Sequence, residues 1–404
     1  MSDDEADPEL LELLRQHIQG KLNVSAEAET GVLEGAEYVY DNSIDVAVDM
    51  RACKNAAAII HAQMQSKGFS TASWAEHELH PKSKDESTVA FIFTMDLLNF
   101  SFWSLKPEDE RFAINYKDKN WTGYWSLVAA LQRALEEGVC NSDQLPHCRI
   151  RVDMCRASNL RAVSAMMYFV DRCFKGIPIT DPHYWQSEDE CNLESLRHVF
   201  RSCTEEEMPL LEERLTCLRE AGKVLYEKYS CSVTNLIDAA DGSAAELVNM
   251  LARDFDCFRD EHMFQSRKKP IRLLKRAQIF VADVWACFNG EDWGEFRDID
   301  KITMFADYRV PQILATLGCI SYSPPLQAMV NKEDIIESGS AYELQLRACS
   351  IWCVELLRRE INRAHPEAKV NAILIDFFLY DTMKQLEAEG KYTMPHHRTR
   401  SIWY

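Results

Sequence analysis

The sequence predicts a mainly α-helical fold, with one helical domain at residues 31–404. Long segments place apolar residues three and four positions apart, as on one face of a helix. Glycine and proline are sparse, with 14 and 13 residues among 404, and they fall between these segments. Few segments alternate apolar and polar residues, which disfavours a sheet protein.

The first half of the chain begins with an acidic segment, residues 1–30, which we expect to be a flexible leader. Residues 36–67 are rich in alanine and are expected to be helical, ending at Gly68. Residues 87–103 start with β-branched and aromatic side chains, so either a strand or a buried helix is possible there. Residues 121–138 follow the helical spacing and close with glycine, a common residue after a helix end.

The second half contains further segments with helical spacing. Residues 208–229 interleave Glu with Lys and Arg on the expected solvent face. Residues 243–255 open with Ser243, and Glu246 follows three positions later, which is the pattern of a capping box. Four more helices are expected, at 273–288, 310–318, 341–365 and 371–390.

One segment differs from its surroundings in charge. Residues 139–175 contain six Lys or Arg and three Asp, a net charge of +3 in a chain of −19, and they hold four of the fourteen cysteines. The flanking sequences "ALEEG" and "GIPITDP" would join directly, as a helix end and a proline loop. We interpret the segment as a poorly packed insertion; a regulatory or interaction element is the alternative.

The overall charge and composition limit the class of protein. A net charge of −19 repels a phosphate backbone, so binding to DNA or RNA through a basic face is not expected. The N-terminus has no signal-peptide pattern. The sequence contains no run of 18 apolar residues, so no membrane span is expected. The scattered cysteines include no C-x-x-C pair and are expected as reduced thiols. We therefore predict a cytoplasmic protein without a membrane partner, with the nucleus as a second location.

Familiar cofactor motifs are missing from the sequence. There is no phosphate-binding loop, dinucleotide fingerprint, nucleophile elbow or H-E-x-x-H motif. His77 and His80 lie three positions apart, but no further ligand cluster accompanies them, and structural zinc needs four convergent nitrogen or sulfur ligands. Cys349 and Cys353 are expected on one helical face as buried structural thiols. The sequence thus predicts neither a metal nor an organic cofactor.

Several carboxylates occur in unusually apolar surroundings, namely Asp96, Asp283, Asp307, Asp376 and Asp381. Asp is seldom buried without a partner, because burial disfavours its charged form. Each acid could simply cap a helix or pair with a nearby Arg or Lys. Their repeated association with Phe, Tyr and Trp instead favours an aromatic pocket with acidic groups. If 371–390 is a helix, Asp376 and Tyr380 share a face, and Asp381 lies about 100° further round.

Several sequence blocks point to a known family. They include "MDLLNFSFW", "TGYWSLVAALQRALEEG", "IPITDP", "LLKRAQIFVADVWACF", "MFADYRVPQILATLG", "ILIDFFLYD" and "HHRTRSIWY". These blocks closely resemble the queuosine salvage protein family of queuosine 5′-phosphate N-glycosylases, in the same order from about residue 36 to residue 404. Segment 139–175 is the departure, because family members run from the "EEG" turn almost directly into "IPITDP".

The resemblance implies an all-helical fold related to the helix-hairpin-helix DNA glycosylases. It also implies hydrolysis of the N-glycosidic bond of queuosine 5′-monophosphate, which releases queuine for reincorporation into transfer RNA. No metal or redox cofactor is implied. Related DNA glycosylases use one Asp near a helix start, and "FADYRVP" places Asp307 at the matching position.

The chemistry of the implied substrate favours a carboxylate in this role. Queuine is a 7-deazaguanine, so carbon replaces N7, the usual protonation point of a purine leaving group. The enzyme must therefore gain more from stabilising the positive charge that develops on the sugar. A carboxylate below the anomeric carbon can stabilise this charge, orient water or attack directly. We predict Asp307 as this catalytic group, with the three roles left open.

Other residues are expected to bind the substrate. A carboxylate can accept hydrogen bonds from the guanine-like edge of the base or pair with its secondary ammonium, so the predicted base-binding residues are Asp376, Tyr380 and Asp381. Aromatic rings can stack on the base or belong to the core, and the candidates are Phe100, Phe102, Phe305 and Trp103. Candidate histidine contacts are His77 and His80. The phosphate candidates, which could also be solvated basic pairs, are Lys275 with Arg276 and Arg398 with Arg400.

Two other functions remain open at this stage. A nucleic-acid glycosylase would act on a flipped base, but the acidic charge of the chain argues against it. A helical protein could also bind queuine without cutting any bond. In the favoured interpretation the partner is a small molecule, queuosine 5′-monophosphate or queuine, and no nucleic acid binds directly.

Overall fold

The computed structural model describes residues 28–71, 74, 76–137, 176–265, 267–391 and 394–404. Two of the expected features fall largely outside these ranges. Only the last three residues of the expected leader at 1–30 are described. Segment 139–175 lies outside the described residues.

Helices dominate the described residues, which confirms the prediction of a mainly α-helical fold. Before residue 200 they are α2 (Val32–Asp41), α3 (Met50–Lys67), α5 (Glu86–Leu97), α6 (Tyr124–Glu136), α9 (Pro182–Gln186) and α10 (Leu193–Val199). After residue 200 they are α11 (Leu211–Tyr229), α12 (Val233–Asp238), α13 (Ala244–Asp254), α14 (Lys275–Cys287), α15 (Arg309–Thr316), α16 (Pro324–Lys332), α17 (Ala341–Ala364) and α18 (Ala372–Ala388). No helix in the described ranges combines the length and apolar character that crossing a membrane requires.

Short antiparallel strand pairs correct the expectation of an all-helical chain. The pairs are β1 (Val46–Val48) with β6 (Ile320–Tyr322), β2 (Ile114–Tyr116) with β3 (Lys119–Trp121), and β4 (Glu261–His262) with β5 (Ile271–Arg272). β1 also divides the segment 36–67, which was expected as one helix. After β1, Asp49 caps α3 by accepting hydrogen bonds from the N–H groups of Arg51 and Ala52, both at 2.8 Å. A three-residue strand is too short to show the alternation by which strands are recognised in sequence.

Residues 87–97 of the ambiguous segment 87–103 belong to the buried helix α5, and no part of the segment forms a strand. Asp85 caps this helix, and its carboxylate accepts the N–H of Thr88 at 3.1 Å. All residues from Phe91 to Leu97 are buried. A helix enclosed on every side has no polar face, so the helical period is hidden in the sequence.

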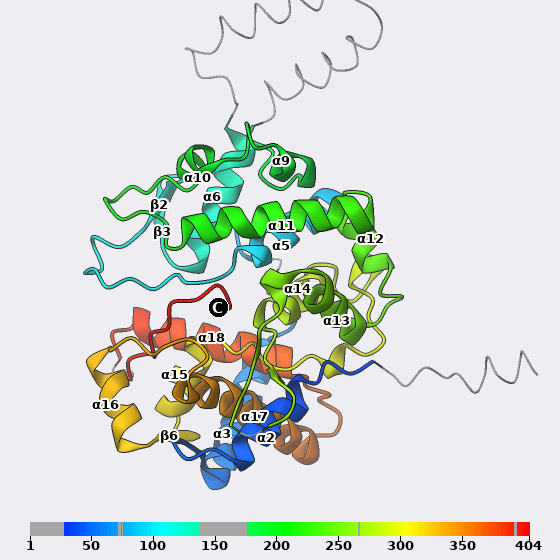
Figure 1. Ribbon diagram of the computed structural model, residues 1–404. Helices are drawn as coiled ribbons and strands as arrows, with labels where there is room; N and C mark the ends of the chain where they lie inside the picture. The colour runs from blue at the N-terminus through cyan, green and yellow to red at the C-terminus, as the bar shows by residue number, and fades with distance from the viewer. Residues whose placement is uncertain (1–27, 72–73, 75, 138–175, 266, 392–393) are drawn as a thin grey trace, which may run out of the picture.

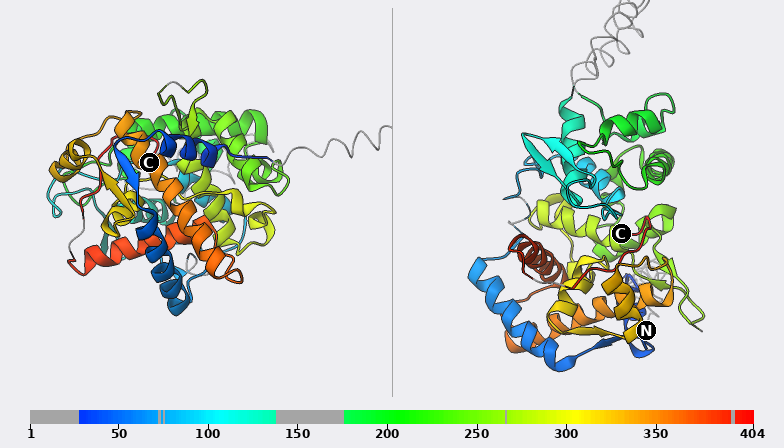
Figure 2. Two further views of the ribbon diagram at one scale, coloured as in Figure 1. Left: turned by 90° about the horizontal axis from the view of Figure 1, so that it is seen from below. Right: turned by 90° about the vertical axis from the view of Figure 1, so that its left-hand side faces the viewer.

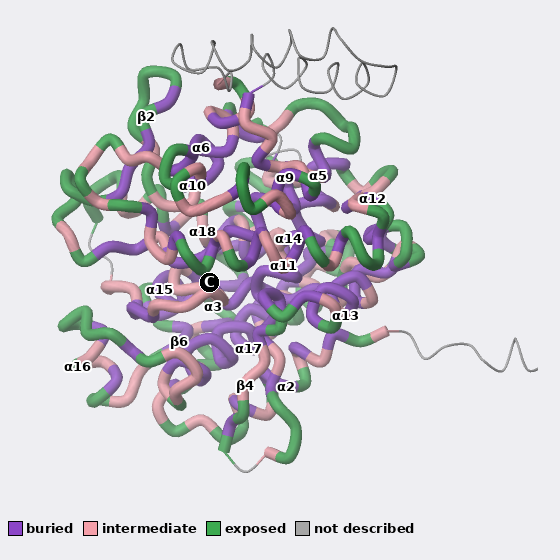
Figure 3. The backbone as a smooth tube through the Cα atoms, turned by 45° about the horizontal axis from the view of Figure 1, so that its top comes forward, coloured by how far each residue is buried: buried purple, intermediate pink, exposed green. Residues whose placement is uncertain are grey.

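The helices form two groups in space (Figures 1 and 2). The upper group, as drawn in Figure 1, contains α5, α6, α9, α10, α11 and the β2–β3 hairpin. The lower group contains α2, α3, α15, α16, α17, α18 and the β1–β6 pair. α14 lies between them and packs on α5. At the centre of the lower group, α17 is buried without interruption from Glu343 to Glu355 (Figure 3).

Candidate active site

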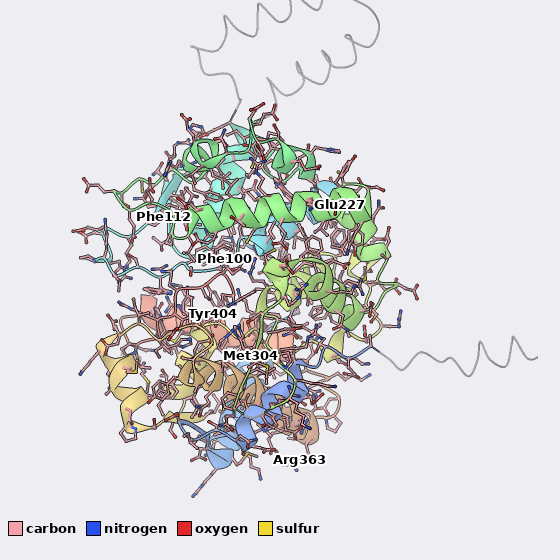
Figure 4. All side chains as sticks on the ribbon, viewed as in Figure 1. Phe100, Phe112, Glu227, Met304, Arg363 and Tyr404 are labelled. Atoms are coloured by element: carbon pink, nitrogen blue, oxygen red, sulfur yellow. The ribbon has the colours of Figure 1, made fainter. Side chains whose placement is uncertain are left out.

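A cavity of about 520 Å³ opens between the upper and lower groups. The upper group, the segment between α3 and α5, and α14 contribute polar and aromatic side chains, among them His77, His80, Asn99, Phe102, Tyr124, Trp125, Lys275 and Asp283. The lower group contributes Phe305, Asp307, Tyr308, Arg309, Asp376, Phe377, Tyr380, Asp381 and Lys384. Tyr404 also lines the cavity, and Figure 4 shows it between Phe100 and Met304. The cavity thus brings together residues from distant parts of the chain.

Asp307 lies immediately before the first turn of α15. Its Oδ1 accepts hydrogen bonds from the N–H groups of Arg309 and Val310, at 2.8 and 3.0 Å. Amides in the first turn of a helix have no partner within the helix, so an acidic side chain there is both held in place and electrostatically favoured. The other carboxylate oxygen receives no hydrogen bond from the described residues, which leaves it available to a ligand.

Opposing influences act on the charge of Asp307. Burial raises the pKa of this carboxyl group, whereas Lys275 and the two backbone N–H groups lower it, and the net effect is a raised pKa. Lys275 is itself buried, and its Nζ donates to the carbonyl oxygen of Asn99 at 3.3 Å. Burial lowers the pKa of Lys275, while the charges of Asp307 and Asp96 raise it. Asp307 and Lys275 therefore stabilise each other's charged forms.

α18 contributes acidic side chains to another wall of the cavity. Its residues have the helical spacing that the sequence predicted. Asn371 caps the helix, and Asp376 and Tyr380 share the face toward the cavity. The Oδ2 atom of Asp376 accepts the N–H of Phe305 at 3.0 Å, which ties α18 to the segment before Asp307. Burial, and then the charge of Asp307, raise the pKa of Asp376 well above its usual range. Asp381 also lines the cavity but is exposed.

Asp283 of α14 and Asp96 of α5 form another pair of neighbouring acids. Asp283 lines the cavity, whereas Asp96 is fully buried and does not. Burial raises the pKa of Asp96 to about 7. Burial, and then the charge of Asp96, raise the pKa of Asp283 well above its usual range. Burial and the charge of Asp96 together favour the protonated form of Asp283.

Stacked rings from the segment between α3 and α5 and from the start of α6 form one wall of the cavity. Trp74 stacks on His80 with ring centroids 3.9 Å apart, and Trp125 stacks on His77 at 3.3 Å. One ring nitrogen of His80 lies 2.7 Å from the carbonyl oxygen of Trp74, and the other lies 3.0 Å from the hydroxyl of Tyr124. Burial lowers the pKa of His80 to about 3, so its imidazole is neutral at physiological pH. This wall offers flat surfaces and no positive charge from His80.

Two of the predicted stacking residues, Phe100 and Trp103, do not line the cavity. The guanidinium groups of Arg214 and Arg276 cover Phe100, at 4.2 and 5.0 Å from its ring centroid. Arg400 covers Trp103 at 3.7 Å. Cation–π contacts therefore occupy the faces that a base would need. Among the predicted aromatic residues, the structure places Phe102 and Phe305 at the cavity.

The four predicted phosphate-binding residues are also separated by the structure. Lys275 lines the cavity, but Arg276 donates to backbone carbonyl groups inside the core. Arg398 pairs with Glu333 at 2.6 Å, and Arg400 covers Trp103. The cavity lining supplies two other cations, Arg309 and Lys384, which both also pair with Glu387.

Sequence reasoning missed several residues of the lining, notably Trp74, Asn99, Tyr124, Trp125, Phe377 and Tyr404. Tyr124 and Trp125 open α6 and follow an ordinary amphipathic pattern, which concealed their position at the cavity. Tyr404 is brought in only by tertiary packing, in which its carbonyl oxygen accepts the N–H of Ser101 at 2.9 Å. The position of Phe377 at the cavity could have been predicted, because it directly follows Asp376 on the predicted helix.

Comparison with known proteins identifies the family of this chain. The family described as queuosine salvage protein matches residues 79–150 and 149–404, with the break inside segment 139–175.

Three relatives are each named queuosine 5′-phosphate N-glycosylase/hydrolase. The one from Schizosaccharomyces pombe is 41% identical over 387 residues, covering 92% of this chain and 99% of the relative. The one from Mus musculus is 36% identical over 377 residues, covering 92% and 98%. The one from the bacterium Sphaerobacter thermophilus is 33% identical over 375 residues, covering 93% and 98%. The chain belongs to the queuosine salvage protein family.

Proposed function

We propose that this protein hydrolyses the N-glycosidic bond of queuosine 5′-monophosphate and releases queuine for salvage into transfer RNA. The observation that carries the proposal is the position of Asp307. Two backbone N–H groups hold one of its carboxylate oxygens at the wall of a cavity of about 520 Å³ lined by aromatic rings and acids. That volume is in the range of small-molecule sites, about 300–1,000 Å³. The names of the relatives agree with this reaction.

In the proposed reaction, Asp307 acts as a carboxylate toward the ribose. As the bond to the base breaks, positive charge develops on the sugar, and a fixed negative charge nearby lowers the energy of that state. The second carboxylate oxygen can stabilise this charge, orient the attacking water or form a transient bond. Lys275 supports the reaction because its positive charge lowers the pKa of Asp307 and so favours the carboxylate.

Asp376, Tyr380 and Asp381 are the proposed partners of the base. The raised pKa of Asp376 favours a neutral carboxylic acid, which can donate to a carbonyl oxygen and accept from an N–H group. Asp381, at the exposed part of the lining, suits the secondary ammonium of queuine. Phe305, Phe102 and the Trp74–His80 stack provide surfaces for the ring. Arg309 and Lys384 are the proposed cations for the 5′-phosphate.

We also propose an organisation of the chain into a leader and one domain. We place the acidic leader at 1–30 and one helical domain at 31–404, related in fold to the helix-hairpin-helix DNA glycosylases. An Asp at a helix start beside a base-sized cavity supports that relationship. Segment 139–175 is proposed as an insertion, because Ile177 N–H bonds to the carbonyl oxygen of Ala134 at 2.7 Å, so the chain leaves and re-enters at one place. The expected location remains the cytoplasm, with the nucleus as the alternative.

An assay for free queuine tests the reaction directly. The protein is incubated with queuosine 5′-monophosphate and, separately, with the nucleoside queuosine, and the products are identified by mass spectrometry. Release of queuine with ribose 5-phosphate supports the proposal. The difference in release rate between the nucleotide and the nucleoside measures the contribution of the phosphate. Binding without release would instead identify a queuine-binding protein. Tight, steeply salt-dependent binding to duplex DNA with no release from the nucleotide would favour a nucleic-acid glycosylase.

A further inference from the structure

Three cysteine side chains converge in the lower group, among residues that do not line the active-site cavity. Cys53 lies in the first part of α3, Cys319 precedes β6, and Cys353 lies within α17. Their Sγ atoms all lie within 4.8 Å of one another, and those of Cys53 and Cys353 are 3.5 Å apart. Figure 1 shows α3, β6 and α17 together in the lower group. Cys53 is about 300 residues from Cys353 in sequence, so tertiary folding alone creates this sulfur cluster.

The sulfur cluster is closed to solvent. Cys53 exposes 2% of its surface, and Cys319 and Cys353 expose none. A single buried cysteine is ordinarily a small apolar residue of the core. Cys349 illustrates that case, because it lies one turn before Cys353 on α17, and its Sγ is 4.0 Å from the carbonyl oxygen of Val46. Three sulfur atoms that meet from three elements need a different explanation.

The sulfur cluster supplies the kind of donor that a soft metal ion prefers. Cysteine sulfur selects soft ions, and the Sγ atoms of Cys53, Cys319 and Cys353 all lie within 4.8 Å of one another.

The geometry limits which cation fits. Thiolates that bind one ion at about 2.3 Å stand about 3.8–4.0 Å apart, which is compatible with the observed sulfur separations. Among the described residues, no fourth His, Cys or carboxylate ligand atom joins the sulfur cluster within 4.8 Å. Structural zinc takes four protein ligands, whereas soft sulfur ligands also select monovalent copper. Three sulfur atoms in an apolar enclosure therefore favour a soft ion that is satisfied by three ligands.

We propose that Cys53, Cys319 and Cys353 bind one soft monovalent cation of the Cu⁺ type through their three sulfur atoms. Three metal–sulfur bonds form, the three S–H bonds break with their protons passing to solvent, and no electron is transferred. The ion joins α3 and α17 to the turn that follows α15. Because Asp307 lies at the other end of α15, the ion stabilises the scaffold of the active site without contacting the substrate.

The test is a titration of the reduced, full-length protein with Cu⁺ under anaerobic conditions. The ion is supplied as its bicinchoninate complex, whose loss of colour reports transfer to the protein. The variants are Cys53→Ser, Cys319→Ser and Cys353→Ser, and the matched control is Cys349→Ser on the same helix. We expect the parent protein and Cys349→Ser to take up one more equivalent than each cluster variant. Cysteines 140, 148, 155 and 173 are present in every protein, so any ion that they bind is common to all titrations.

A second measurement decides the matter if a cluster variant fails to fold. The parent protein is loaded with one equivalent of Cu⁺ and treated with iodoacetamide in mild denaturant, and peptide mass spectrometry then identifies the protected thiols. Protection of Cys53, Cys319 and Cys353, with a three-sulfur shell by X-ray absorption, supports the proposal. Protection confined to the cysteines of 139–175 would overturn it. Equal Cu⁺ uptake by the parent protein and all cluster variants would also overturn the proposal. So would preferential binding of Zn²⁺ over Cu⁺, with oxygen among the ligands of the zinc ion.

Discussion

The charge of Asp307 depends on neighbours that partly offset the effect of burial on its pKa. Burial favours the protonated form, whereas Lys275 and the N–H groups of Arg309 and Val310 favour the carboxylate. In the proposed reaction, the ionised form of Asp307 can stabilise positive charge on the sugar, and the protonated form cannot. The activity of this residue should therefore respond both to its own replacement and to the loss of Lys275.

Asp307→Asn removes the charge while keeping the size of the side chain. We expect turnover to fall by about 10²–10³-fold, because a fixed charge aimed at the transition state is lost, while queuine affinity changes little. Initial rates of queuine release and calorimetric binding measure the two effects. Asp300→Asn, an exposed acid seven positions earlier, is the matched control and should keep full turnover. Normal turnover in Asp307→Asn would eliminate it as the catalytic group.

The pH profile should show the raised pKa of Asp307. kcat/KM should decline as the pH falls through that pKa, which lies above the ordinary value of about 3.9 for Asp. In Lys275→Met the carboxylate loses its buried cation, so its pKa rises further and the acidic limb should move to higher pH. Initial rates across a pH series measure this limb in both proteins. A shift of the limb to lower pH in the variant would contradict the proposed role of Lys275.

At the scale of elements, α18 and the segment before α15 form one unit. The hydrogen bond from Phe305 N–H to Asp376 joins them, so the acid that is proposed to bind the base also positions the chain that leads to Asp307. Displacement of α18 should thus disturb both binding and turnover.

Asp376→Ala should weaken queuine binding by about 1–3 kcal/mol, the usual effect of leaving a buried polar partner unsatisfied. It should also lower the melting temperature, because Phe305 N–H loses its acceptor. Asp376→Asn keeps an oxygen acceptor for that N–H, so we expect it to restore stability but not full affinity. Calorimetric binding and thermal melting separate the two effects. Unchanged affinity in both variants would place the base elsewhere in the cavity.

Individual elements show which parts of the fold the sequence could predict. α18 and α17 were predicted near their observed limits, because long helices with caps leave a clear pattern. β1 was missed because three residues cannot show a period, and its partner β6 lies some 270 positions later in the chain. α5 stayed ambiguous because burial on all sides removes its polar face.

The cavity residues show the same limit for the site. Asp307, Asp376 and Tyr380 could be named because acids within apolar runs are rare, and helical spacing then relates them. The positions of Phe100 and Trp103 could not be predicted, since only tertiary packing determines that arginine side chains cover their rings. Adjacent aromatic residues in one sequence block can thus face different environments.

At the scale of the whole molecule, the described residues on either side of segment 139–175 contact each other. Ile177 N–H donates to Ala134, and Gly176 lies so close to Leu135 that an added Cβ would be 2.1 Å from its carbonyl oxygen. With a φ of 80°, Gly176 also adopts a conformation that other residues rarely take. These contacts are made by residues that lie outside the segment.

A protein that lacks 139–175, with Gly138 joined to Gly176, should therefore fold and release queuine at a rate within about twofold of the parent. The physical reason is that long surface insertions contribute little to stability when their ends already meet. Thermal melting and the queuine assay measure the outcome. Gly176→Val is the informative comparison, because it should destabilise the parent through steric conflict at the junction. Loss of activity in a well-folded deletion protein would instead identify the segment as a functional element.

The uninterrupted burial of α17 has a consequence for the motions of this protein. Amide hydrogens between Glu343 and Glu355 can exchange with deuterium only when the packed structure around them opens, so they should be among the slowest in the chain. Their exchange rate reports the free energy of global unfolding. The amides of Arg309 and Val310, which bond to Asp307, report local opening at the cavity. One exchange experiment, followed by mass spectrometry with and without queuine, would thus separate movement at the active site from unfolding of the whole chain.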